Sequence, residues 1–148
     1  MPEAPQFLER YRMSYKFNAA HNTSGREDGQ HVHTFRLVIF IGKTSDSYVD
    51  FYDYENRIKS LVDRYSGKVF NDFEEFSEIR PTVENIAIYI YRTLSSMFES
   101  DPSLKVVQVE LGDSPTQRFS VSDDYVICSV NRTFPRERLL RFLEERRI

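Results

Sequence analysis

The first pattern in the chain is a regular alternation of apolar and polar residues. From Tyr11 to His21, aromatic and aliphatic side chains occupy every second position, which is the period of a half-buried strand and places His21 on its apolar face. The segment 22–30 is polar and contains two glycines, so it is predicted to be a loop. The β-branched and aromatic run 31–41 follows it. Two long strands joined by a short loop are therefore expected.

The apolar spacing then changes from two residues to three or four, which is typical of amphipathic helices. Between Asp50 and Gly67 one helical face is apolar, and Gly67 is placed to end the helix. A second helix is predicted to begin after Pro81, with Thr82 as its N-cap. The residues expected to face inward are Ile58, Leu61, Val62 and Tyr65 in the first helix, and Val83, Ile86, Ala87, Ile90, Leu94 and Met97 in the second.

The C-terminal third returns to strand-like patterns before a final helix. Strands are predicted over 105–111, 119–122 and 125–130, and Pro135 is placed to open a charged C-terminal helix. That helix carries Leu139, Leu140 and Leu143. The order β-β-α-α-β-β-α predicts an α+β fold. Because no repeat or linker interrupts the 148 residues, we expect one domain over 1–148.

Composition narrows the possible partners. Hydrophobic residues make up 40% and charged residues 29%, which is ordinary for a soluble globular protein. A net charge of −3 gives no overall attraction to nucleic acid or anionic lipid. Cys128 is the single cysteine, so no intramolecular disulfide can form, and neither a leader nor a membrane-spanning run is evident. We therefore expect a cytoplasmic protein with no nucleic-acid or membrane partner.

The candidate chemistry lies in the histidines, of which the chain has three: His21, His31 and His33. Residues two apart on a strand share a face, so His31 and His33 are expected side by side, and a hairpin would bring His21 next to them. Three imidazoles and one open position are the donor set of a catalytic zinc site. The sequence therefore predicts one bound Zn²⁺. The alternative is three unrelated histidines, one at a strand end and two facing solvent.

Several short motifs, taken in order, resemble one known family. Phe17-Asn18-Ala19-Ala20-His21 and His31-Val32-His33 are similar to the F-x-A-A/S-H and H-G-H motifs of the 6-pyruvoyl-tetrahydropterin synthase and 6-carboxytetrahydropterin synthase family. Val49-Asp50-Phe51 resembles the segment before the family's first helix, and Pro81-Thr82-Val83-Glu84-Asn85 resembles its P-T-x-E-N helix start. Val107-Gln108-Val109-Glu110 resembles the strand whose glutamate anchors the pterin.

The resemblance covers about residues 13–122 and leaves the strand and helix of 123–148 as an extension. It implies a T-fold, or tunnelling fold, in which an antiparallel sheet carries two helices on one face, with the C-terminal helix as an addition here. It also implies trimers that close a β-barrel, two trimers stacked as a homohexamer, and active sites between subunits.

The same resemblance assigns roles to individual residues. It implies that the three histidines hold zinc, that Glu110 binds the amino edge of the pterin ring, and that Thr82 and Glu84 contact substrate. A carboxylate suits that edge because it accepts two parallel hydrogen bonds. The alternatives are an exposed strand residue for Glu110, and an N-cap with a first-turn acid for Thr82 and Glu84.

The sequence departs from the family at the proton-transfer residues. Glu27 stands where the catalytic cysteine is usual, and Asp28 stands where a branch that releases 6-hydroxymethyl-dihydropterin carries a glutamate. The family's Asp-His pair aligns with Phe70-Asn71-Asp72-Phe73, which leaves Asp72 without a histidine. Glu27, Asp28 and Asp72 are therefore the expected catalytic acids or bases. The alternative is that all three are solvated loop acids.

Together these features predict a zinc-dependent lyase that acts on the side chain of a reduced pterin such as 7,8-dihydroneopterin triphosphate. The products considered are 6-pyruvoyl- or 6-carboxytetrahydropterin, or 6-hydroxymethyl-dihydropterin after side-chain cleavage, in queuosine or folate-type biosynthesis. Two rivals remain open. One is a non-catalytic, zinc-containing homologue that binds a pterin or purine, and the other is a metal-binding structural module.

Overall fold

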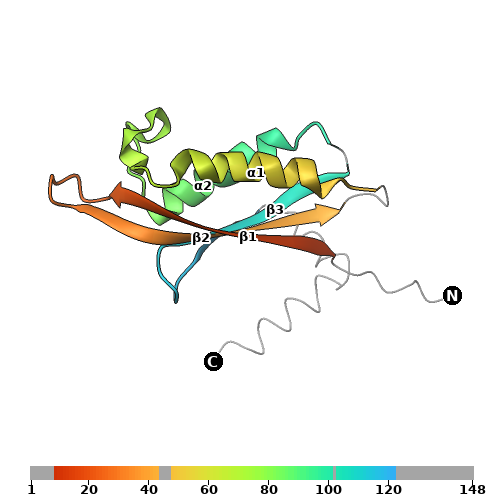
Figure 1. Ribbon diagram of the computed structural model, residues 1–148, viewed down its shortest axis with the longest axis horizontal. Helices are drawn as coiled ribbons and strands as arrows, with labels where there is room; N and C mark the ends of the chain where they lie inside the picture. The colour runs from red at the N-terminus through yellow and green to blue at the C-terminus, as the bar shows by residue number, and fades with distance from the viewer. Residues whose placement is uncertain (1–8, 44–47, 102, 123–148) are drawn as a thin grey trace, which may run out of the picture.

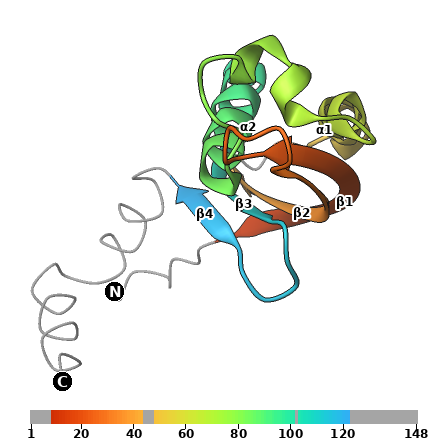
Figure 2. The ribbon, with the colours of Figure 1, turned by 90° about the vertical axis from the view of Figure 1, so that its left-hand side faces the viewer.

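The computed structural model describes residues 9–43, 48–101 and 103–122. Within them the strands form one antiparallel sheet in the order β1-β2-β3-β4 (Figures 1 and 2). These strands are β1 (Arg10–Asn22), β2 (Gln30–Lys43), β3 (Leu104–Gly112) and β4 (Phe119–Ser122). The predicted strand over 125–130 and the C-terminal helix, together with Cys128, lie outside the described residues.

Two helices cover one face of the sheet (Figures 1 and 2). They are α1 (Phe51–Tyr65) and α2 (Val83–Met97), and the side chain of Thr82 accepts a hydrogen bond from the backbone N–H of Asn85. The predicted N-cap is thus confirmed, as is the α+β architecture with two helices on one face. No helix in the described part of the chain is long and apolar enough to cross a membrane.

The core lies between the helices and the facing side of the sheet. Strand register pairs Phe17 with Phe35 and Ile39 with Val109, so the alternate residues of neighbouring strands point to the same side. The rings of Phe17 and Phe35 stack with centroids 5.5 Å apart. Burial of each such side chain contributes roughly 1.5–3 kcal/mol to folding. The sheet and helix residues that are at most 1% exposed are Phe35, Leu37, Ile39, Ile41, Ile58, Tyr65, Ile86, Ala87, Leu94, Val109 and Leu111.

A short segment between the helices pairs with the outer edge of β1. The N–H of Gly67, a residue with φ of +73°, donates to Asn18 O, and the N–H of Ala20 donates to Lys68 O at 2.9 Å. The side-chain amide of Asn71 makes two hydrogen bonds to the backbone of Asn22. It accepts one from the Asn22 N–H at 2.8 Å and donates one to the Asn22 carbonyl oxygen at 2.9 Å. The C-terminal end of β1, which carries His21, is therefore held on both edges.

Candidate metal centre and substrate site

His21 is a buried polar residue with a defined orientation. Its side chain, with 4% of the residue exposed, places Nδ1 2.8 Å from the carbonyl oxygen of Pro81. Because a carbonyl only accepts, Nδ1 carries the proton and Nε2 keeps its lone pair. Burial lowers the pKa of His21 below its usual value, against the smaller opposing effect of the Pro81 hydrogen bond. A neutral imidazole whose other nitrogen is held by a backbone carbonyl is the form that ligates metals.

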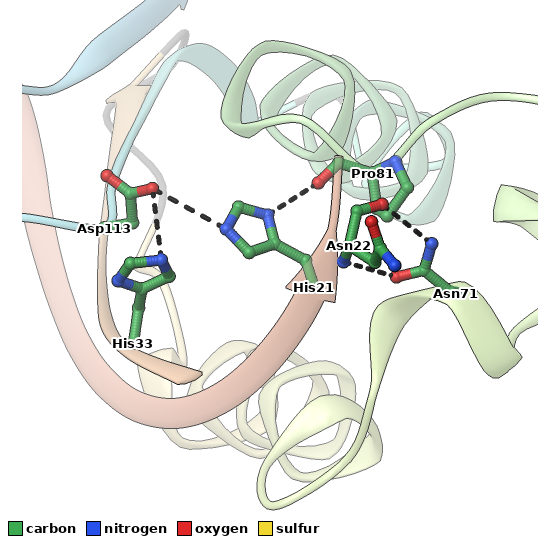
Figure 3. Close-up of polar contacts among 6 residues, drawn as sticks. All are labelled: His21, Asn22, His33, Asn71, Pro81 and Asp113. Atoms are coloured by element: carbon green, nitrogen blue, oxygen red, sulfur yellow. Dashed lines mark hydrogen bonds and ion pairs between the residues drawn. The ribbon is translucent and has the colours of Figure 1, made fainter. Parts of the chain in front are cut away.

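His33 and Asp113 face the free nitrogen of His21 (Figure 3). Asp113 Oδ2 lies 3.7 Å from His21 Nε2 and 3.9 Å from His33 Nε2. Both distances are too long for hydrogen bonds and close to the separation of about 3.3 Å between donors bound to a tetrahedral zinc ion. One ligand atom from each residue lies within 4.8 Å of the others. The three residues therefore fit a divalent metal ion.

His31 lies on the same side of the hairpin but farther out. It pairs directly with His21 in the strand register, and its ring centroid is 6.1 Å from that of His33. His31 is exposed, whereas His33 is half-buried and packs edge-on against His21 at 5.1 Å. The structure thus brings His21 and His33 together as predicted, and leaves His31 at the rim of the same pocket.

The cluster forms part of the wall of an open cavity of about 770 Å³, a size typical of small-molecule sites. The strand ends form one side of this cavity, the start of α2 a second, and the β3–β4 loop a third. The predicted substrate residues Thr82 and Glu84 both line it. The full lining is His21, Thr23, His31, His33, Thr82, Val83, Glu84, Asp113, Thr116, Gln117, Arg118 and Phe119.

The family model described as 6-pyruvoyl tetrahydropterin synthase matches residues 11–124, which is most of the chain. This chain belongs to the 6-pyruvoyl tetrahydropterin synthase family. Members of the family are pterin-processing enzymes of the lyase type. Among curated proteins, none matches the sequence directly.

Solved structures agree with this family assignment. The 6-pyruvoyl tetrahydropterin synthase of Caenorhabditis elegans superposes with a TM-score of 0.66 at 19% identity, over 81% of this chain and 99% of that one. A Plasmodium vivax 6-pyruvoyltetrahydropterin synthase superposes with a TM-score of 0.57 at 17% sequence identity, over 80% of this chain and 99% of that one. An uncharacterized protein from Wolinella succinogenes superposes with a TM-score of 0.65 at 16% sequence identity, over 80% of this chain and 99% of that one. The likeness extends to nearly the whole of each relative and confirms the T-fold.

The acids that replace the family's usual proton-transfer residues lie outside the cavity lining. Glu27 and Asp28 are exposed in the loop between β1 and β2, and Asp72 is exposed in a short 3₁₀ turn, Phe70–Asp72. Within one protomer none of the three forms part of the wall around His21 and His33. Their catalytic role stays a prediction.

Glu110 lies on the opposite face of the sheet from the histidines. Its neighbour Leu111 is fully buried under the helices, and successive strand residues point to opposite faces, so Glu110 points away. There it accepts a hydrogen bond from Gln108 Nε2 at 3.0 Å and lies 3.8 Å from Arg118. Within one protomer, this placement keeps Glu110 away from the histidine pocket. The pterin-anchoring role that the family resemblance implies for Glu110 stays a prediction.

Asp113 is the site residue that the sequence reasoning missed. The available signal was strand parity, because Val109, Leu111 and Asp113 are two residues apart and continue one face. Its place beside His21, however, depends on the register in which β3 pairs with β2, which puts Gly112 opposite Arg36. That long-range register cannot be read from the residue pattern alone.

Proposed function

We propose that this family member is a zinc-dependent enzyme that acts on the side chain of a reduced pterin such as 7,8-dihydroneopterin triphosphate. The observation that carries the proposal is the convergence of two imidazole nitrogens and a carboxylate on one wall of a cavity large enough for a substituted bicyclic ring. A pterin-processing family supplies the class of substrate. The single cysteine and the charge balance favour the cytoplasm.

Different residues of the cavity wall are proposed to hold the metal ion and to contact the substrate. His21 and His33 would hold Zn²⁺, with Asp113 or His31 as a third donor. A bound zinc ion supplies Lewis-acid polarisation of a substrate oxygen. Thr82 and Glu84, at the start of α2, are placed to contact the ring or its side chain from the cavity wall. The Pro81 carbonyl fixes the ring of His21, so the geometry of the centre is set before substrate arrives.

A carboxylate is the proposed proton acceptor in place of a thiol. The Plasmodium vivax structures include variants in which a glutamate described as a catalytic residue is replaced by cysteine or alanine, so a glutamate is a catalytic residue in that relative. Glu27 or Asp28 would remove the proton from the hydroxyl on the second side-chain carbon, and that oxygen would become the carbonyl of a departing aldehyde as the bond between the first and second side-chain carbons breaks. The electron pair of that bond would pass to the first carbon, which is attached to the pterin ring and would take up a proton, with Asp72 as a candidate donor. This retro-aldol cleavage requires no cysteine and releases 6-hydroxymethyl-dihydropterin.

Assembly is part of the proposal because the acids lie outside the lining of the cavity in one protomer. We place them, and Glu110, at sites completed by neighbouring copies in a homohexamer built from two barrel-forming trimers. Each copy would contribute one domain spanning 1–148. The pathway served would be queuosine or folate-type biosynthesis.

A second candidate function is a non-catalytic, zinc-containing homologue that binds a pterin or purine. It is favoured by one observation, that the acids replacing the usual cysteine and Asp-His pair are exposed and away from the cavity. A binder of this kind would keep the metal and the pocket and show no turnover.

The test is to load the purified full chain with zinc, measure metal content by elemental analysis, and add dihydroneopterin triphosphate. Mass spectrometry of the products is expected to show conversion, with Glu27→Gln/Asp28→Asn as the matched inactive variant. Unchanged substrate that nevertheless raises the melting temperature would favour the binder. Failure to take up any divalent metal would overturn both readings.

A further inference from the structure

The sheet face that points away from the helices carries a concentration of positive charge. By strand parity and register, Arg10, Arg12, Lys16 and Arg36 all lie on this face. Glu110, on the same face, is the one acidic residue in the four described strands. The protein as a whole has a net charge of −3, so cations are segregated to this face.

Two of these cations oppose each other directly. Lys16 on β1 pairs with Arg36 on β2 in the antiparallel register, and like charges directly opposite destabilise a sheet. Glu110, the one acidic side chain on this face of the described strands, lies 3.8 Å from the guanidinium of Arg118. Arg36 is nevertheless only partly exposed. An arrangement of this kind is stabilised when an anion binds between the cations.

A cavity of about 350 Å³ lies at this pair. Arg118 reaches it from the β3–β4 loop and adds a third cation, and Ser14 adds a hydroxyl donor. Its complete lining is Ser14, Tyr15, Lys16, Arg36, Leu37, Val38 and Arg118. The metal cluster lies on the other face of the sheet, and Arg118 at the sheet edge borders both cavities.

We propose that this second cavity binds the phosphoryl group of a small, free phosphorylated molecule. Guanidinium groups match phosphate oxygens with paired hydrogen bonds, lysine adds a point charge, and a serine hydroxyl donates a further bond. The cations converge on a concave site of ligand size, which suits a compact oligophosphate. The inference does not depend on the metal centre or on the reaction proposed above.

The probes are inorganic phosphate and inorganic triphosphate, titrated calorimetrically into the full-length protein at low ionic strength. Triphosphate is expected to bind more tightly than phosphate, because it meets more of the cations at once. Arg36→Ala and Lys16→Ala are each expected to weaken triphosphate binding by about tenfold or more, the loss typical of one charge-assisted hydrogen bond. Arg36→Lys keeps the charge but loses the paired N–H donors of the guanidinium group. Its affinity for triphosphate should lie between that of Arg36→Ala and that of the unaltered protein.

Two matched variants make the result specific. Arg92→Ala removes an exposed arginine from α2, on the helix side of the sheet, and should leave the affinity unchanged. His33→Ala, in the metal cluster, should also leave it unchanged. Amide chemical shifts are expected to move at Ser14–Lys16 and Arg36–Val38, and circular dichroism of each variant establishes that it is folded.

Several results would overturn the proposal. These are no detectable triphosphate binding, an equal loss in Arg92→Ala, or shift changes confined to the histidine pocket. Tighter binding of a short RNA, or binding restricted to vesicles that contain a phosphoinositide, would assign the face to a macromolecule or a lipid headgroup instead of a free phosphate.

Discussion

One face of the β1–β2 ladder forms hydrophobic core in the middle of the ladder and the candidate metal centre at its loop end. At Phe17 and Phe35 the face is closed under the helices, and the rings stack with both residues buried. Toward the loop, the next pairs on this face bring in His33 and then His21 with His31. Exposure along β2 rises from buried Phe35 to half-buried His33 to exposed His31. One uninterrupted pattern therefore supplies both the core and the candidate metal centre.

The hydrophobic core holds the two histidines of the candidate metal centre in place. The ring of Phe35 lies 5.4 Å from that of His21 and 6.0 Å from that of His33, so the core directly supports both ligands. Glu27 and Asp28 lie beyond the strand ends and have no such support. Precise chemistry is built on rigid elements, and groups on loops need a further partner to be held in place.

Removing the ring of Phe35, which packs against both the core and the two histidines, should give the largest loss of stability. Phe35→Ala deletes a fully buried ring and is expected to lower the free energy of unfolding by about 3–5 kcal/mol. The measurement is chemical denaturation of the metal-free protein. Val32→Ala, at a position 73% exposed on the same strand, is the control and should cost less than about 0.5 kcal/mol. A loss in Phe35→Ala as small as that of the control would contradict the described core.

Removing a ligand should separate metal binding from folding. His33→Ala is expected to weaken zinc binding by more than about a hundredfold, because loss of a donor exceeds the 10–100-fold effect of losing a residue behind a donor. The melting temperature of the metal-free variant should stay near that of the parent, since His33 is only half-buried. Competition with a chromophoric chelator gives the affinity. Unchanged affinity would show that the ion, if any, lies elsewhere.

The identity of the third donor can be decided by a pair of variants. Asp113 lies within 4 Å of both ligand nitrogens, whereas His31 is at the rim of the pocket. Asp113→Asn keeps an oxygen donor and removes only its charge, so it is expected to weaken zinc binding about tenfold, and His31→Gln by less than about threefold. The visible spectrum of the Co²⁺ form provides an independent readout of the donor set. The reverse order of effects would restore the three-histidine centre predicted from the sequence.

Features of the fold that depend on local interactions could be predicted from the sequence, and features that depend on contacts between distant segments could not. The strands, both helices and the Thr82 cap follow from local periodicity and local hydrogen bonding. The strand pattern also places His21 and His33 on one face. The short 3₁₀ turns and the approach of Asp113 to the histidines are set by contacts between distant segments, which no local pattern encodes. Family motifs assigned Glu110 a role, yet strand parity places it on the other face.

The smallest expected effect concerns the residue that stands in the region of the family's missing Asp-His pair. Asn71 makes two hydrogen bonds to the backbone of Asn22, next to His21, so Asn71→Ala should lower the free energy of unfolding by about 1 kcal/mol. Zinc affinity should fall only a few-fold, because the Pro81 carbonyl still orients the ring of His21. Denaturation and chelator competition measure the two quantities, with Asn56→Ala, an exposed change on α1, as the control. A large loss of zinc affinity without a loss of stability would instead mean that Asn71 acts on the metal centre itself, as a chemical replacement for the absent pair.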